Sequence, residues 1–316
     1  MYFPYLRGRQ YELIALRELL ENDRLSKIVV PIIEPVKLSS TLINTLEEFK
    51  NKNQQCSLIL NPAVGSFVEE YNNGKKGNLV KRLNEIFNNN DNLYHASLMS
   101  KNYRVENNFR LISDIHKQIT ICKNPDDIEG YQANYAQQPT AYNLISENSK
   151  LKREVGGNKV KIDDHFIKRL RNTDYSKKSD EFFSDDHKYF LSDGYTGFSD
   201  YSIVGDEYNE SGFAPYAVAI HIVYFNQEED LRIFHFVSDS NLDPTDPAGK
   251  FGEALSKLMY KVNEGKIPET LAISEFKRLH STGSYPGLGT VKKLSIMHHI
   301  ELVGSYLDNN EIGDSQ

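Results

Sequence analysis

The first half of the chain alternates between two kinds of segment, and this alternation constrains the fold more than any other feature. Seven short apolar runs are separated by longer stretches, most of which carry apolar residues at helical spacing. The runs at 27–36 and 118–122 are rich in Ile and Val, with little alternation, which is typical of strands buried on both faces of a parallel sheet. The seven runs lie at residues 2–6, 27–36, 57–60, 93–99, 118–122, 140–145 and 158–162.

The stretches between these runs predict helices that link parallel strands. Strands that alternate with helices form βα units, and seven candidate strands before residue 165 favour a closed (β/α)8 TIM-barrel-like sheet. A doubly wound open sheet is the alternative. The predicted helices span residues 10–21, 41–50, 79–87, 105–115 and 126–136.

The second half predicts an elaboration of this α/β fold. Residues 165–170 are expected to extend the last unit as a helix, and residues 173–216, aromatic, acidic and punctuated by glycines, are expected to form an elaborated loop insertion. Residues 217–237 predict a β-hairpin, because two β-rich runs flank a short polar turn at 226–230. Helices are expected at 251–263, 271–279 and 288–307. We therefore predict one α/β barrel-like domain over residues 1–307 and a disordered tail over 308–316.

Charge and composition limit the classes of function. The formal net charge is −7, which disfavours general nucleic-acid binding because phosphate contacts need clustered Lys and Arg. Cys56 and Cys122 each lie in an apolar run, which indicates buried free thiols. No run approaches the ~18 consecutive apolar residues of a membrane helix, and no signal-peptide pattern opens the chain. We expect a cytoplasmic protein that does not enter a membrane.

Polar residues follow several of the predicted strands. In a parallel sheet these positions meet at one rim, where arginines could clamp an anionic ligand and carboxylates could bind Mg²⁺. The structural alternative is that such residues only form turns, with Arg7 and Arg9 pairing with Glu12, Glu34 or Glu47. The candidates at this rim are Arg7, Arg9, Glu34, Asn61, Ser100, Lys101, Lys123, Asn143, Asp163 and Asp164.

A second group of candidates lies beyond residue 165. Two or three converging carboxylates there could bind Mg²⁺ or act in acid–base chemistry, although carboxylates beside glycines also order loops. His221 and His235 lie on the two hairpin strands and are expected to be cross-strand neighbours. A metal pair is one reading, and satisfied core or interface histidines are the favoured one, since no third ligand is evident. The other candidates are Arg169, Arg171, Asn172, Asp174, Tyr175, Asp193, Asp200, Tyr201, Asp206, Glu207 and Tyr208.

Five segments carry a resemblance to a known family. They begin at Tyr2 (Tyr-Phe-Pro-Tyr-Leu-Arg-Gly-Arg-Gln-Tyr-Glu-Leu), Arg171 (Arg-Asn-Thr-Asp-Tyr), Gly197 (Gly-Phe-Ser-Asp-Tyr-Ser-Ile-Val-Gly-Asp), Ala217 (Ala-Val-Ala-Ile-His) and Phe234 (Phe-His-Phe-Val-Ser-Asp). Together they resemble the "beta protein" family of bacteria and phages, and more narrowly a bacterial branch encoded beside a second small uncharacterised protein. The resemblance implies a bacterial, cytoplasmic, mobile-element-associated protein. It brings no catalytic mechanism, but it draws attention to Arg171, Asp174, Tyr175, Asp200, Tyr201 and His221.

Three functional hypotheses follow. The leading one is a component of a bacterial anti-phage defence module that binds the protein encoded by the adjacent gene, or a phage-derived ligand; homo-oligomer formation stays open. The alternative is a metal-dependent phosphoester or nucleotide hydrolase, with Mg²⁺ and catalytic Glu34, Asp163 and Asp200. In that hydrolase Arg7, Arg9 and Lys101 would hold phosphate. The third is a nucleic-acid-binding subunit that uses the basic stretch 152–171.

Overall fold

The computed structural model describes residues 1–104, 114–209 and 215–311 of the chain. These residues pack as two compact units, which are described separately. Unit 1 comprises Met1–Glu21, Lys27–Asp163 and Asp186–Tyr201, and unit 2 comprises Asn22–Ser26, Asp164–Asp185 and the rest from Ser202. The expectation that 1–307 behave as one domain stays a prediction.

Unit 1 is an eight-stranded, all-parallel barrel-like sheet, which confirms the predicted fold class. Tyr2 makes isolated parallel bridges to Val29 and to Phe198, and the Phe3 amide donates to the Phe198 carbonyl over 2.8 Å, so the two edges of the sheet come together. The strands follow the order β1 (Tyr5–Leu6), β2 (Ile32–Ile33), β3 (Cys56–Ile59), β4 (Leu93–Leu98), β5 (Gln118–Cys122), β6 (Tyr142–Ile145), β7 (Lys159–Asp163) and β9 (Gly197–Asp200).

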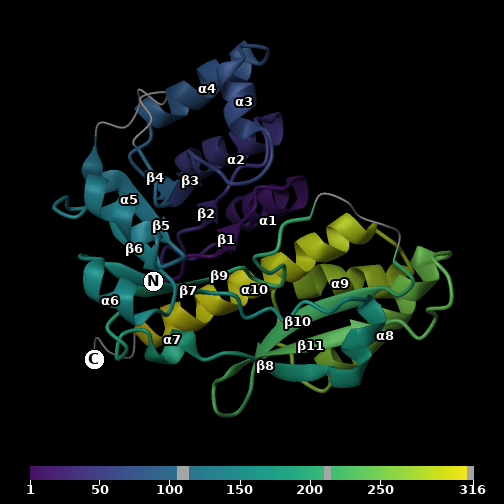
Figure 1. Cartoon of the computed structure of the whole chain (residues 1–316). Helices are drawn as coiled ribbons and strands as arrows, with labels where there is room; N and C mark the ends of the chain where they lie inside the picture. Colours follow the sequence, from purple (N-terminus) through teal and green to yellow (C-terminus); the bar gives the residue numbers. More distant parts are fainter. Residues whose placement is uncertain (105–113, 210–214, 312–316) are drawn as a thin grey trace. The chain divides into compact units, whose positions relative to one another are not determined.

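Helices lie outside these strands, and side chains fill the interior. Figure 1 shows the helices of the first half outside the strands that they connect. Helix α2 begins where the Ser39 hydroxyl accepts from the Leu42 amide, as a helix cap requires. The barrel core includes Tyr5, Ile32 and Ile121, all almost fully buried. The helices of unit 1 are α1 (Gln10–Glu21), α2 (Ser40–Asn51), α3 (Phe67–Asn72), α4 (Gly77–Asn88), α5 (Asp127–Asn134), α6 (Ser149–Glu154) and α7 (Asp186–Tyr189), with a short 3-10 turn, η1 (Ile115–Lys117).

The eighth strand, β9, corrects the prediction that 173–216 form a loop insertion. That segment also contains a 3-10 helix, η2 (Asn172–Lys178), the strand β8 (Asp180–Ser184) and α7. The first residue of β9 is Gly197. A Cβ atom at this position would lie 2.8 Å from the Met1 carbonyl oxygen and from the Phe3 ring. The backbone of β9 therefore approaches the N-terminal segment more closely than a larger residue allows.

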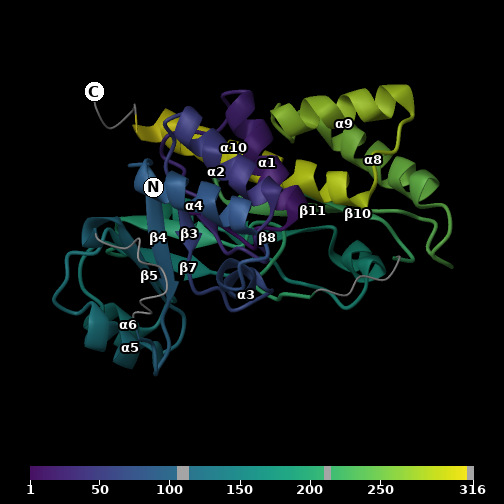
Figure 2. The same cartoon turned by 90° about the horizontal axis from the view of Figure 1, so that it is seen from above.

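Unit 2 is built on a three-stranded antiparallel sheet. Its order is β10 (Ala219–Phe225), β11 (Leu231–Val237) and β8, and the first two form the predicted hairpin. Three helices follow: α8 (Pro247–Asn263), α9 (Leu271–Thr282) and α10 (Leu288–Glu311), close to the predicted ranges. Both views show α8 and α9 side by side (Figures 1 and 2).

Several local predictions need correction. Residues 165–170 are not helical, and the short helices α3 and α6 were not predicted. Of the predicted helix 105–115, residues 105–113 lie outside the described residues. Helix α10 includes 308–311 of the predicted tail, and 312–316 lie outside the description. None of the helices in the described ranges is both long and apolar enough to cross a membrane.

Candidate functional site

The carboxyl rim of the barrel holds a buried ion pair. Glu34, directly after β2, is fully buried and accepts hydrogen bonds from the Tyr5 hydroxyl (2.6 Å) and the Ala63 amide (2.8 Å). Its carboxylate also pairs with the guanidinium of Arg7. Burial, followed by the charge of Glu34, raises the pKa of Tyr5 well above its usual value. The pairing of Arg7 with Glu34, one of the structural alternatives, is confirmed.

Two cations lie over the same pair of rings at this rim. The Nζ atom of Lys123, directly after β5, is 4.9 Å from the Tyr5 ring centroid and 4.8 Å from that of Tyr201. The Arg7 guanidinium lies 5.5 and 5.9 Å from the same centroids. Tyr201 directly follows β9, so the ends of β1, β2, β5 and β9 meet here. Tyr5, Arg7, Glu34 and Tyr201 are all buried, so most of this cluster is packed inside the carboxyl rim.

The other rim candidates do not join this cluster through the contacts described. Asn61 bridges to the next strand, donating to the Leu98 carbonyl (2.8 Å) and accepting from its amide (2.9 Å). Lys101 is exposed and lies 3.5 Å from Glu129. Arg9 is half-buried just before α1.

The carboxylates of the predicted hydrolase site differ in their burial. Asp200 is buried and accepts from the Tyr2 hydroxyl over 2.9 Å. Asp163 is its register partner on β7 but is exposed. In residues 1–104, 114–209 and 215–311, no group of three or more His, Cys, Asp or Glu side chains could hold a metal ion. The described residues therefore do not support a Mg²⁺ site formed by Glu34, Asp163 and Asp200.

A polar row crosses one face of the sheet of unit 2. His221 and His235 are register partners on β10 and β11, as predicted, and their Nδ1 atoms are 2.7 Å apart. The Nε2 atom of His235 is 3.1 Å from Glu181 on β8. Glu181 and His235 are buried, whereas His221 is partly exposed. The row thus leads from a buried carboxylate to a partly exposed histidine.

The surroundings of this row set its protonation. Arg169 donates to both carboxylate oxygens of Glu181, over 2.8 and 3.2 Å, and Lys178 lies 3.3 Å away. Burial raises the pKa of Glu181, but the hydrogen bond from His235 and these cations outweigh it, so the pKa is lowered. Burial, and then the neighbouring His235, lowers the pKa of His221 to about 3. Both effects favour ionised Glu181 and neutral His221 at neutral pH.

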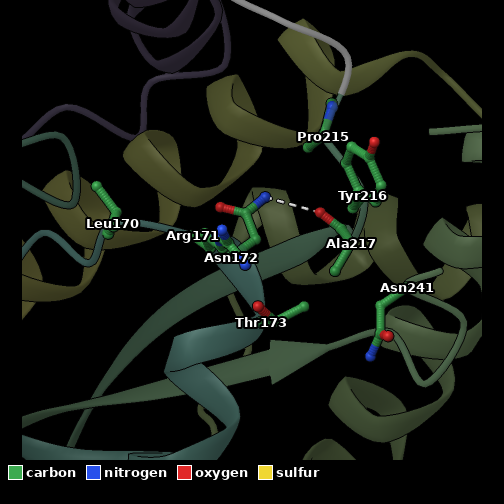
Figure 3. A pocket seen from close by; sticks show the side chains of 8 residues that line it. All are labelled: Leu170, Arg171, Asn172, Thr173, Pro215, Tyr216, Ala217 and Asn241. Atoms are coloured by element: carbon green, nitrogen blue, oxygen red, sulfur yellow. Dashed lines mark hydrogen bonds between the residues drawn. The ribbon is translucent and has the colours of Figure 1, made fainter. Parts of the chain in front are cut away.

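Aromatic rings and a pocket adjoin this part of unit 2. The Tyr175 ring lies 4.6 Å from the His221 ring and 4.7 Å from that of His235. A pocket of about 620 Å³ is formed where η2 begins, and Figure 3 shows the Asn172 amide pointing to Ala217, whose carbonyl accepts its hydrogen bond over 2.8 Å. The pocket is lined by Leu170, Arg171, Asn172, Thr173, Pro215, Tyr216, Ala217 and Asn241.

The predicted candidates of the second half thus have different surroundings. Arg171 lines the pocket, Tyr175 packs against the histidines, and Asp174 pairs with Lys177 over 2.8 Å. Glu181 was not predicted, because its strand lies within the segment interpreted as a loop. The adjacent Phe182 and Phe183, both of a residue type that is common in strands, are the strand-like signal there.

Comparison with known proteins leaves the family undecided. No family model matches the chain, and no curated protein matches it either.

Proposed function

We propose that this protein is the partner-binding component of a bacterial anti-phage defence module, and that its partner docks at the pocket of unit 2. The observation that carries this proposal is a pocket whose edge combines a guanidinium with strongly exposed apolar side chains. Leu170 is 94% exposed and Tyr216 is 57% exposed, and both line the pocket. Leu242, 91% exposed, directly follows the lining residue Asn241.

Such a combination favours a protein ligand. A single exposed leucine is ordinary, but apolar side chains gathered around a pocket are typical of interaction sites. Arg and Tyr are among the residues that contribute most to binding at protein interfaces. Arg171 could hold a carboxylate through two parallel hydrogen bonds, while Leu170 and Tyr216 bury an apolar neighbour.

The occupant that fits is therefore a segment with an apolar anchor beside a carboxylate. We assign this segment to the protein encoded by the adjacent gene, on the basis of the family resemblance. A phage-derived protein segment of the same chemistry is the competing occupant, and binding experiments distinguish the two. The metal-dependent hydrolase receives no comparable support from the described residues, because their carboxylates do not form a metal-binding group.

The test is co-expression with the adjacent gene product, followed by affinity measurement on the purified proteins. The variants Leu170→Asp and Arg171→Glu are expected to weaken binding at least about tenfold, equivalent to about 1.4 kcal/mol. Leu191→Asp is the matched control, since Leu191 is 69% exposed but belongs to unit 1. The same two variants should abolish protection in a phage-plating assay.

Two results would contradict the proposal. One is undiminished affinity of both pocket variants for the adjacent gene product. The other is a complex that forms equally well with and without this pocket while Leu191→Asp disrupts it. Binding of a phage protein alone, with loss in the pocket variants, would reassign the occupant and refute the assignment to the neighbouring gene.

A further inference from the structure

The polar row in unit 2 admits one arrangement of protons when both histidines are neutral. Ionised Glu181 only accepts, so the Nε2 atom of His235 carries its proton and donates it. The Nδ1 atom of His235 is then an acceptor, and the facing Nδ1 atom of His221 must be the donor. The remaining ring nitrogen, Nε2 of His221, therefore holds a lone pair. Within the described residues it has no hydrogen-bond partner, and His221 is partly exposed.

We propose that Glu181, His235 and His221 form a proton relay, and that the Nε2 atom of His221 is the catalytic base that takes a proton from a hydroxyl group or a water molecule. This inference is independent of partner docking, because His221 does not line the pocket. It rests on the row of hydrogen bonds and on the burial of its members, since Glu181 and His235 are buried and His221 is partly exposed. A carboxylate that fixes the tautomer of a histidine is a recurring device of acid–base sites.

The proton transfer balances within the row. The O–H bond of the ligand or water breaks and an N–H bond forms at Nε2 of His221, while the oxygen keeps the electron pair. The Nδ1 proton of His221 passes to Nδ1 of His235, whose imidazolium is then stabilised by ionised Glu181 over the 3.1 Å contact. Return of both protons restores the starting state when the oxygen, or a product derived from it, takes its proton back.

The groups facing the row support this direction of transfer. Arg169 and Lys178 keep Glu181 ionised, and Tyr175 lies against both imidazoles with its hydroxyl accepting from the Arg169 amide. Burial lowers the pKa of His235, Glu181 and then Asp180 on the same strand act against this, and Arg169 acts with it, so His235 is neutral at neutral pH before the transfer. The low pKa of His221 means that its lone pair stays available well below neutral pH.

The experiment measures acylation of His221 by diethyl pyrocarbonate, which reacts with an unprotonated and accessible imidazole nitrogen. The full-length protein is treated at pH 7.5 and pH 5.5 with N-acetylhistidine as an internal reference, and peptide mass spectrometry locates the product. The reference, with a pKa of about 6.5, should slow about tenfold at the lower pH, whereas His221 should change less than about twofold. An unreactive His221, or one that slows as the reference does, would overturn the proposal.

Nitrogen-15 NMR of the histidine rings provides a second measurement on the unaltered protein. We expect His221 to carry its proton on Nδ1 and His235 on Nε2, and an Nε2-protonated His221 would overturn the relay. Glu181→Gln should reduce the acylation rate of His221 at least about tenfold. Lys177→Met is the matched control, because it removes an exposed cation of the same segment that pairs with Asp174 over 2.8 Å and not with Glu181, and it should leave the rate within about twofold. If Glu181→Gln does not fold, the pH comparison and the NMR spectra decide alone.

Discussion

The buried pair at the barrel rim gives the most direct test of how unit 1 is held together. Glu34→Gln keeps the shape of the side chain but removes the charge that faces the buried guanidinium of Arg7. Glu34 is fully buried, and the Arg7 side chain is only 10% exposed, so solvent screens this pair weakly. Loss of one partner of a buried pair costs about 3–5 kcal/mol. For a protein of this size, with an unfolding entropy of about 2.1 cal/mol/K per residue, that corresponds to a fall in Tm of roughly 5 to 8 °C.

The assay is urea unfolding followed by circular dichroism, with thermal scans as a second measurement. The matched control is Glu47→Gln, since Glu47 pairs with Arg82 over 2.6 Å in unit 1 but both side chains are about one-third exposed. That control should cost no more than about 1 kcal/mol. If Glu34→Gln and Glu47→Gln lower the free energy of unfolding equally, burial of the Arg7 pair does not have the energetic role assigned to it.

Two further predictions concern stability. Gly65→Ala should destabilise unit 1 by more than Gly74→Ala in the same urea assay. Both residues have a left-handed φ, near +74° and +71°, but only at Gly65 would a Cβ overlap the Val36 carbonyl oxygen. Equal losses of stability, about 1 kcal/mol each, would show that backbone strain alone acts. Burial, and then Lys117, lowers the pKa of His95 to about 4, so the unfolded chain binds this proton more readily and stability should fall as the pH drops from about 6.5 towards 4. His95→Phe keeps the stacking on Phe87 and removes an Nδ1 atom without a partner among the described residues. It should abolish about 2 kcal/mol of the loss of folding stability at pH 5. An unchanged dependence of stability on pH would show that His95 is not its cause.

Seven of the barrel strands could be predicted from the sequence, because parallel strands buried on both faces are dense apolar runs. The eighth was not, because β9 reads Gly-Phe-Ser-Asp, and its polar residues are buried for reasons of tertiary structure. Asp200 accepts a hydrogen bond from Tyr2, and Gly197 leaves room for the N-terminal segment. Both contacts form only when the edges of the sheet come together. No local pattern encodes a contact across such a distance in sequence.

The site residues divide in the same way. The pairing of Glu34 with Arg7 was among the alternatives, because a carboxylate between apolar residues requires a nearby cation. The pairing of His221 with His235 could be predicted, because the lengths of the two hairpin strands and their turn place these residues opposite each other. The link from His235 to Glu181 could not be predicted, since it requires that β8 pairs with β11 across fifty-odd intervening residues.

The path of the chain through its two units has a consequence for how this protein can be made and divided. After β7 the polypeptide leaves unit 1 to contribute β8 to unit 2, and only then returns with β9. During synthesis, a sheet of the first seven barrel strands therefore has two unpaired edges until the ribosome has passed residue 200. A fragment ending at Asp163 would present those edges to its neighbours, and unpaired strand edges promote aggregation. Neither unit can be excised or transplanted as one continuous piece of gene.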